Sequence, residues 1–134
     1  MSENLDLVRS ICADWERGDF SSVEWADPMI RYVWADGPTP SGSTGLAQMA
    51  AGWRAFLDNW MDLRIDVDEY RVLDDGRVLV LMQRTGRGKA SGIELGQMQT
   101  HGAAVFGLRD RKVSTLVVYF DRDRAFADLG LAPE

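Results

Sequence analysis

The chain contains few of the residues from which disulfide frameworks and metal sites are built. Cys12 is the only cysteine and His101 the only histidine among 134 residues. One cysteine cannot close an internal disulfide, and this pair cannot fill a metal shell unless several buried carboxylates contribute. We therefore expect no metal site, and the sequence calls for no cofactor.

Long apolar runs and an excess of positive charge are also absent. No apolar stretch approaches the ~20 residues that span a bilayer, and the formal net charge of −6 disfavours binding to nucleic acid and to anionic membranes. The first four residues are polar and acidic, without the basic and apolar segments of a signal peptide. We expect a cytoplasmic protein that binds neither nucleic acid nor membrane.

Large apolar side chains are abundant. The hydrophobic content is 46%, and the chain holds five Trp, five Phe and three Tyr residues. A chain of this length fits one domain, which we expect to span residues 1–134. Aromatic residues in this number can fill a core or line a cavity.

Several stretches carry apolar residues at helical spacing. The first helix is expected to end near Gly18, a short helical turn follows over residues 23–25, and Asp121 is expected to cap a last helix that stops at Gly130. The apolar faces of the two long helices are Leu5, Val8, Cys12 and Trp15 in the first, and Leu46, Met49, Trp53, Phe56 and Trp60 in the second, which begins near Thr44.

Strands are predicted where apolar residues alternate or run between turn residues. The expected strands are residues 29–35, 61–68, 77–85, 93–108 and 113–120, with turns or loops at 36–42, 74–76, 86–92 and 109–112. The order is helix, short helix, strand, helix, four strands, helix. It predicts an α+β domain with an antiparallel sheet and the helices on one face.

Specific stretches resemble a known family. They are residues 62–65, 86–88 with 91–92, 108–113, and 119–122 running on to 129–131. Together with the order of elements, they resemble the SnoaL-like branch of the nuclear transport factor 2-like (ketosteroid isomerase-like) superfamily. The resemblance implies a cystatin-like open cone, in which a curved antiparallel sheet wraps long helices around a cavity. It also implies a homodimer through the outer sheet face.

The aromatic residues are the candidates for lining such a cavity. Small residues at Gly102 and Ala104 leave volume on the inward face of their strand, which suits a flat, small apolar ligand. In the alternative, Trp53 or Phe56 fills that volume and forms an ordinary core. The predicted ligand-binding residues are Trp15, Tyr32, Trp34, Trp53, Phe56, Gln99 and Phe106.

Three residues are candidates for acid–base chemistry, and none is clearly placed inside the cone. Asp36 lies in a turn, and Asp121 is better explained as a helix cap. His101 alternates with Gly102 along its strand and is expected to point outward, unless a β-bulge at Gly102 reverses the alternation. Arg84 is expected to reach solvent from a strand end, near a solvated loop with Arg87.

Two functional hypotheses follow. In the first, the protein binds a small apolar molecule without a specific assigned activity. In the second, it is an isomerase, cyclase or hydrolase that acts on a polyketide-, steroid- or terpenoid-like substrate by proton transfer. That second hypothesis requires an acid or a histidine inside the cavity with a shifted pKa.

Overall fold

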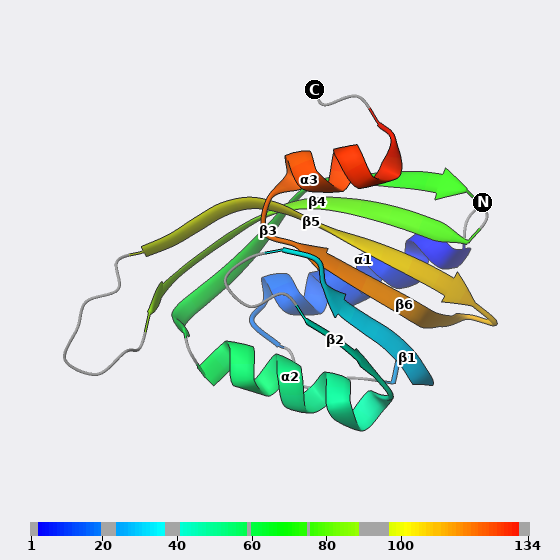
Figure 1. The fold of residues 1–134 in the computed structure, drawn as a ribbon, viewed down its shortest axis with the longest axis horizontal. Helices are drawn as coiled ribbons and strands as arrows, with labels where there is room; N and C mark the ends of the chain where they lie inside the picture. Colours follow the sequence, from blue (N-terminus) through cyan, green and yellow to red (C-terminus); the bar gives the residue numbers. More distant parts are fainter. Residues whose placement is uncertain are drawn as a thin grey trace.

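The structure is a computed structural model that describes residues 3–19, 24–36, 41–58, 60–74, 76–88 and 97–131. For residues 41, 55–58, 60–62, 87–88 and 97–100 the backbone alone is described. The elements in chain order are α1 (Glu3–Glu16), β1 (Ala26–Trp34), β2 (Ser41–Thr44), α2 (Leu46–Asp58), β3 (Trp60–Asp74), β4 (Arg77–Gly88), β5 (Gln97–Arg109), β6 (Lys112–Tyr119) and α3 (Arg122–Leu129). The α+β class expected from the sequence is confirmed (Figure 1).

The strands form one open sheet in the order β2-β1-β6-β5-β4-β3. Strands β3 to β6 are joined as consecutive antiparallel hairpins, as the sequence predicts. The sheet is nevertheless mixed, because β1 pairs with β6 in parallel. The expectation of a wholly antiparallel sheet is therefore wrong at one pair of strands. No hairpin fixes the relative direction of β1 and β6, since α2 and four strands separate them in the chain.

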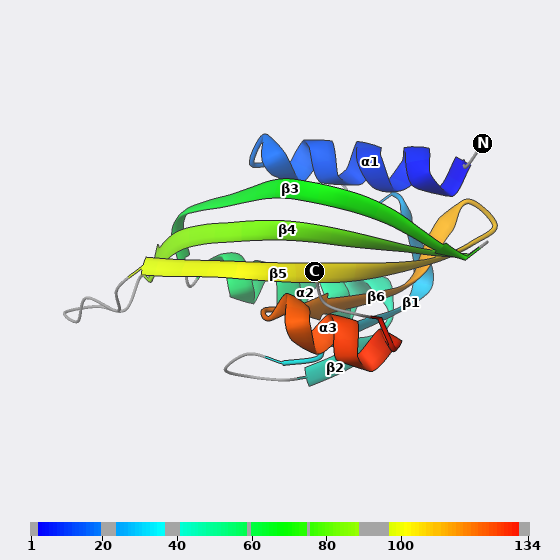
Figure 2. The ribbon, with the colours of Figure 1, turned by 90° about the horizontal axis from the view of Figure 1, so that it is seen from above.

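The two faces of the sheet bury different clusters, which we call the inner and the outer face. The inner face includes Val80, Met82 and Phe106 and is covered by α1 and α2. The outer face includes Leu81 and Val105 and is covered by α3. Figure 2 shows α1 and α3 on opposite sides of the bent strands. Since α3 covers the outer face, the expectation that all helices share one face is wrong.

The alternation predicted for the last two long strands is confirmed. Ala104 and Phe106 lie in the inner cluster with Leu116 and Val118, whereas Val105 lies in the outer cluster. Side chains alternate across a strand, so this pattern requires continuous pairing. The register runs unbroken from Arg77 to Arg87 of β4 against β5, without a bulge at Gly102.

Several element boundaries differ from the prediction. Residues 41–44 form the edge strand β2 rather than a turn, and α2 begins at Leu46. Trp60 begins β3 rather than ending a helix. Glu24 and Trp25 lie in a turn where a short helix was expected, and residues 20–23 lie outside the described residues. The predicted loop at 86–92 is part of β4 as far as Gly88.

The last helix is capped as the sequence predicts. Asp121 has extended backbone angles, and its carboxylate accepts a hydrogen bond from the Asp123 N–H at 2.9 Å. Gly130 closes the helix with a φ of 71°, in the left-handed region that favours glycine. These two residues set the ends of α3.

Candidate functional site

Six aromatic residues form a continuous cluster on the inner face. They are Trp15, Tyr32, Trp34, Trp53, Phe106 and Phe120, and we call them the aromatic cluster. Trp15 lies between Phe106 and Trp53, with ring centroids at 5.8 and 5.5 Å. Trp53 stacks on Trp34 at 6.2 Å, and Trp34 contacts Phe120 at 5.3 Å. The cluster thus joins α1, β1, α2, β5 and the end of β6.

The residues of this cluster were mostly predicted from the sequence. The structure brings together five of the predicted wall residues, namely Trp15, Tyr32, Trp34, Trp53 and Phe106. The side chains of the other two, Phe56 and Gln99, lie outside the described residues. Phe120 was not predicted as a wall residue, although it continues the face of Leu116 and Val118. Trp53 and Phe120 are half-buried, so the cluster extends to the protein surface.

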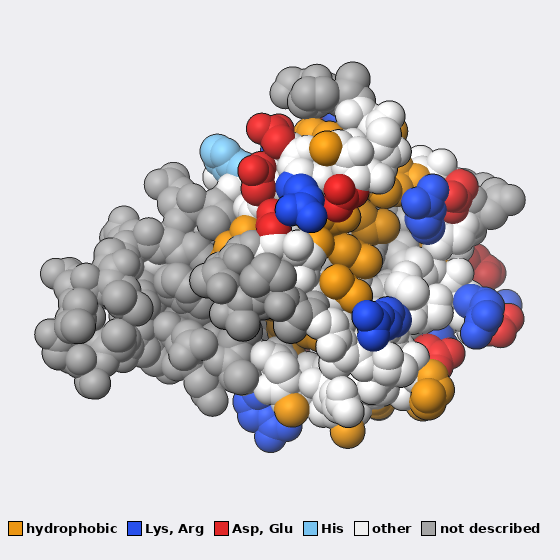
Figure 3. All heavy atoms as spheres, viewed as in Figure 1, with side chains coloured by type: hydrophobic (Ala, Val, Ile, Leu, Met, Phe, Trp, Pro, Cys, Tyr) orange, Lys and Arg blue, Asp and Glu red, His pale blue; other side chains and the backbone are white. Residues whose placement is uncertain are grey.

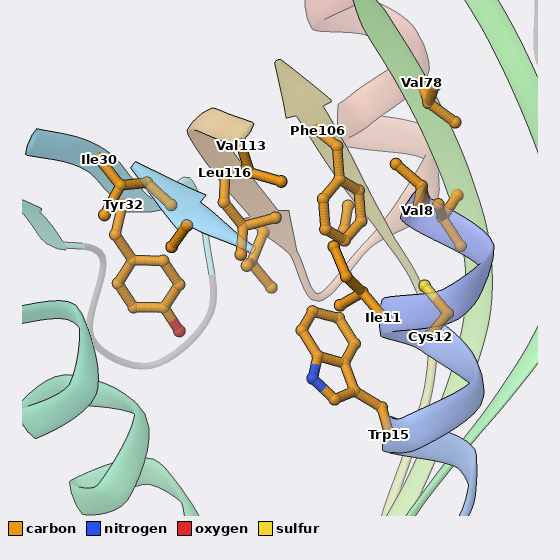
Figure 4. Close-up of a cluster of buried hydrophobic side chains, with 14 of the residues drawn as sticks. Val8, Ile11, Cys12, Trp15, Ile30, Tyr32, Val78, Phe106, Val113 and Leu116 are labelled. Atoms are coloured by element: carbon orange, nitrogen blue, oxygen red, sulfur yellow. The ribbon is translucent and has the colours of Figure 1, made fainter. Parts of the chain in front are cut away.

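Tyr32 places a polar atom among these rings. It lies on β1, is 3% exposed and contacts Trp34 and Trp53 at centroid distances of 6.0 and 6.3 Å. Figure 4 shows its ring extending from β1 with the hydroxyl directed into the interior. Within the described part of the chain, the hydroxyl is buried without a hydrogen-bond partner. The neighbouring Trp34 side chain favours the phenolate more than the Arg84 charge does, although the Tyr32 hydroxyl makes no hydrogen bond of normal geometry among the described residues.

The ionisation of Tyr32 follows from this environment. Burial raises the pKa of the Tyr32 hydroxyl well above its usual range, and the nearby Arg84 charge opposes that rise only in part. The phenol is therefore neutral at physiological pH. A neutral phenol is a hydrogen-bond donor, and this one faces an apolar interior.

Arg84 is the second polar group of the inner face, and the sequence prediction for it is wrong. Its side chain was expected to reach solvent, but it is only 2% exposed. Nη1 donates to the Tyr119 carbonyl at 2.8 Å, and Nη2 donates to the Ala103 carbonyl at 3.4 Å. The guanidinium carbon lies 6.0 Å from the Phe120 ring centroid. Arg84 therefore lies at the Phe120 end of the aromatic cluster.

The small residue at Gly102 explains how the arginine fits. A Cβ atom at this position would lie 2.2 Å from Nη1 of Arg84 and 2.6 Å from the Tyr119 carbonyl oxygen. The sequence prediction assigned the space beside Gly102 to a ligand, with Trp53 or Phe56 as alternative occupants. The structure fills this space with the guanidinium of Arg84.

Arg84 carries a charge that the described residues compensate only from a distance. No carboxylate among them lies within 4 Å of its guanidinium. Burial lowers the pKa of Arg84 to about 10, and the charge of Asp36 acts in the opposite direction. The guanidinium therefore remains protonated at neutral pH. Its two hydrogen bonds to carbonyls use only part of a group with five N–H donors.

The three acid–base candidates have other positions and partners. The Asp36 carboxylate accepts hydrogen bonds from the backbone N–H groups of Phe120 and Asp121, at 2.6 and 3.1 Å. Asp121 caps α3. His101 is exposed and pairs in register with Gln83, and Figure 3 shows the histidine on the surface. The structure thus brings none of the three side chains into the aromatic cluster.

Other reactive groups are few in the described part of the chain. Cys12 is buried against β3, and burial raises the pKa of its thiol to about 12, so it stays protonated. Across the described residues, no three His, Cys, Asp or Glu side chains lie together as metal ligands would. None of the described helices has the length and apolar character needed to cross a membrane.

Comparison with known proteins agrees with this architecture. The profile of the SnoaL-like domain matches residues 8–116. No curated protein matches the sequence. An NTF2-like protein of unknown function from Burkholderia pseudomallei K96243 superposes with a TM-score of 0.76 at 19% identity, covering 95% of this chain and 97% of that one.

Two further solved structures bear on what this fold can hold. A SnoaL-like protein from Jannaschia sp. CCS1, provisionally assigned as a polyketide cyclase, has a TM-score of 0.75 at 16% identity, covering 98% of this chain and 94% of that one. TerC, co-crystallised with polyporic acid, has a TM-score of 0.72 at 18% identity, covering 96% and 98% of the two chains. At these identities the likeness shows the fold.

Proposed function

The chain belongs to the SnoaL-like domain family, and we propose that it binds a flat, largely apolar small molecule against its aromatic cluster. One observation carries the proposal. Rings from α1, β1, α2 and β5 converge on one interior region, and that region holds a buried hydroxyl without a partner. Aromatic walls with a few convergent polar groups are typical of small-molecule sites.

The packing of the cluster indicates where such a molecule would enter. Trp15 and Trp34 are buried, but Trp53 and Phe120 are half-exposed at the surface. A flat ligand that contacts Trp34 therefore has Trp53 and Phe120 as its neighbours on the solvent side. Aromatic rings prefer offset stacks at such separations, so a planar molecule can replace one ring–ring contact with another.

A thermal-unfolding and tryptophan-fluorescence screen tests this proposal. The panel contains polycyclic ketones, lactones, epoxides and fatty acids, together with polyporic acid, which co-crystallised with the structurally similar TerC. A ligand at a hundred times its dissociation constant adds ~2.7 kcal/mol to the free energy of unfolding. We expect one planar class to raise the melting temperature and to quench fluorescence.

Two tryptophan variants make the screen specific to the cluster. Trp53→Ala removes a half-buried ring that contacts Trp15, Tyr32 and Trp34, and should weaken binding by about tenfold or more, as loss of a central aromatic contact does. Trp25→Ala also removes a half-buried tryptophan, which lies beside Trp15 at the edge of the cluster with ring centroids 6.1 Å apart. An equal loss of binding affinity in both variants would contradict the proposal, and so would the absence of binding by every compound in the panel.

Catalysis by proton transfer is the alternative function, and the similarity to a provisionally assigned polyketide cyclase is its support. Within the described residues, Asp36, Asp121 and His101 all lie away from the cluster interior or are held by backbone groups. A ligand from the screen that is converted to product would favour this alternative. Turnover that survives replacement of all three residues would assign the proton transfer to another group.

We also propose that two copies pair through the outer sheet face, as the family resemblance implies. Helix α3 already covers Leu81, Val105 and Tyr119 there, which leaves the surface beyond α3 for pairing. We further propose that residues 1–134 form one domain, since both hydrophobic clusters share a single sheet. Light scattering after size-exclusion chromatography tests the first proposal, where a monomer mass would contradict it. A single unfolding transition would support the second.

A further inference from the structure

We propose that the bound molecule carries an acidic oxygen (a carboxylate, phenolate or enolate) that is held by the guanidinium of Arg84, with the Tyr32 hydroxyl as a second donor. The inference rests on the proposed function and specifies the chemistry of its ligand. It follows from two buried polar groups on one face of the sheet, both of which keep hydrogen-bonding capacity that the described residues leave unused.

Tyr32 provides the first step of the argument. A buried hydroxyl without a partner costs free energy, and buried polar groups in proteins are nearly always hydrogen-bonded. Tyr32 as a residue is 3% exposed, and its hydroxyl has no hydrogen-bond partner among the described residues, although its ring packs against Trp34 and Trp53. A phenylalanine would pack in the same place without that cost. The hydroxyl therefore points to a ligand atom that accepts a hydrogen bond.

Arg84 provides the second step. Burying a guanidinium is expensive, and the cost is normally offset by a carboxylate in direct contact. Arg84 has two carbonyl oxygens and the face of Phe120 as neighbours, while Asp36 acts only at longer range. The negative partner that a buried guanidinium ordinarily contacts is thus not provided by the described residues, and a ligand anion would supply it.

The two groups also border the same aromatic cluster. The Tyr32 ring contacts Trp34, and Trp34 contacts Phe120. The Arg84 guanidinium lies 6.0 Å from the Phe120 ring centroid, so both polar groups border one run of aromatic rings. Both carry N–H or O–H donors and, at neutral pH, neither group offers a negative charge. An acidic oxygen suits this pair better than a cation or an ammonium group, which Arg84 would repel.

A matched pair of ligands isolates the acidic oxygen from the apolar ring. The probes are anthracene-2-carboxylate and anthracene-2-carboxamide, which share one ring system and differ in the charge of the oxygen-bearing group. Calorimetric titration at pH 7 should give at least about a tenfold preference for the carboxylate, the usual gain from a charge-assisted hydrogen bond in a buried site. Raising the salt concentration should reduce that preference little, because a buried contact is poorly screened.

Three variants assign the preference to residues. Arg84→Met keeps an unbranched apolar stem and removes the charged guanidinium, and should abolish the preference while the carboxamide still binds. Tyr32→Phe should lower carboxylate affinity by about threefold to tenfold, as loss of one hydrogen bond does. Tyr119→Phe is the matched control, because its hydroxyl donates to Asp128 at 3.0 Å on the outer face, and it should leave both affinities unchanged.

Each outcome decides the inference. Equal affinity for the two probes in the wild-type protein would overturn the inference but leave the proposed function standing. Binding of neither probe would overturn both. If Arg84→Met fails to fold, the carboxylate affinities of Tyr32→Phe and Tyr119→Phe are compared, and a loss confined to Tyr32→Phe supports the inference. An unchanged carboxylate preference in Tyr32→Phe would remove Tyr32 from the site, and an equal loss in both tyrosine variants would show an effect of stability alone.

Discussion

The two faces of the sheet differ in how a buried tyrosine and a nearby arginine are paired. On the outer face the Tyr119 hydroxyl donates to the Asp128 carboxylate at 3.0 Å. Above it, Arg122 of α3 donates to Asp68 at 2.7 Å and to the Met82 carbonyl. On the inner face, among the described residues, Arg84 donates to two backbone carbonyls and the Tyr32 hydroxyl has no hydrogen-bond partner.

This difference distinguishes polar groups that hold the fold together from polar groups that can still bind a ligand. A tyrosine–carboxylate bond and an arginine–carboxylate pair hold α3 on the sheet, and both partners belong to the chain, although the Arg122 Nε is itself buried without a hydrogen-bond partner among the described residues. The inner pair lies among aromatic rings that reach the surface through Trp53 and Phe120. Polar groups in a protein interior are kept unpaired at a cost in stability, and functional sites are where that cost is usually found. The predictions below test this contrast.

The largest expected change in the free energy of unfolding comes from removing a buried ring from either face of the sheet. Phe106→Ala removes a fully buried ring between α1 and β5, and should lower the free energy of unfolding by about 3–5 kcal/mol. Phe126→Ala removes a ring beneath α3 and should cost about 2 kcal/mol, because an eight-residue helix can settle into the space. Urea unfolding measures both. A larger loss for Phe126→Ala would show that the outer cluster is the main core.

The next effect concerns the space that Arg84 occupies. Gly102→Ala should destabilise the protein by about 2–3 kcal/mol, because the new Cβ meets the Tyr119 carbonyl as well as the guanidinium. Gly52→Ala is the control. Its Cβ would meet only Tyr32 at 3.8 Å, and alanine in α2 should stabilise by about 0.5–1 kcal/mol. A neutral Gly102→Ala would mean that Arg84 does not lie against Gly102.

A smaller effect separates the two tyrosines in the absence of ligand. Tyr32→Phe removes a buried hydroxyl without a partner, so stability should stay the same or rise by up to about 1 kcal/mol. Tyr119→Phe removes a hydroxyl that bonds Asp128 and should lower stability by about 1 kcal/mol. Thermal unfolding of the two variants side by side measures the difference. Destabilisation by Tyr32→Phe would show that its hydroxyl has a partner within the protein.

The smallest effect is a pH dependence of the outer face. The hydrogen bond from Arg122 lowers the pKa of Asp68 below its usual value of 3.8 in the folded protein. A depressed carboxyl pKa stabilises the fold above the unfolded pKa of about 3.9, and this contribution is lost as the pH falls through the folded value.

Arg122→Gln should therefore cost up to about 1 kcal/mol at pH 7, as surface ion pairs do, and less at pH 3. Urea unfolding at pH 7, 5 and 3 measures the difference between the variant and the wild-type protein. A constant difference at all three pH values would assign the effect to the Met82 carbonyl bond rather than to the charge of Asp68.

Much of the fold could be predicted because its signals are local. Period-2 alternation placed Phe106 and Val118 on the inner face, and helical spacing placed Trp15 and Trp53 on the faces of two helices. The cap at Asp121 was predictable for the same reason, since it depends on its own helix. The parallel pairing of β1 with β6 could not be predicted, because it depends on residues far apart in the sequence and no local pattern indicates it.

Of the two polar groups on the inner face, Tyr32 was among the predicted residues, whereas the burial of Arg84 was not predicted, and the reason is the strand boundary. Thr85, Gly86 and Gly88 are typical of a loop, so Arg84 was placed at a strand end with access to solvent. In the structure β4 continues to Gly88, which puts Arg84 within the sheet and turns it to the inner face. Its partner atoms belong to Tyr119 and Ala103, distant in sequence, and no local pattern indicates such contacts.

A crystal structure of the protein with anthracene-2-carboxylate tests the central claim most directly. The account predicts that the ring system lies against Trp34 and Trp53 on the inner face. It also predicts that one carboxylate oxygen lies within hydrogen-bond distance, about 2.7–3.2 Å, of an Arg84 nitrogen. A probe bound on the outer face beside α3, or one whose carboxylate points into solvent away from Arg84, would contradict the account.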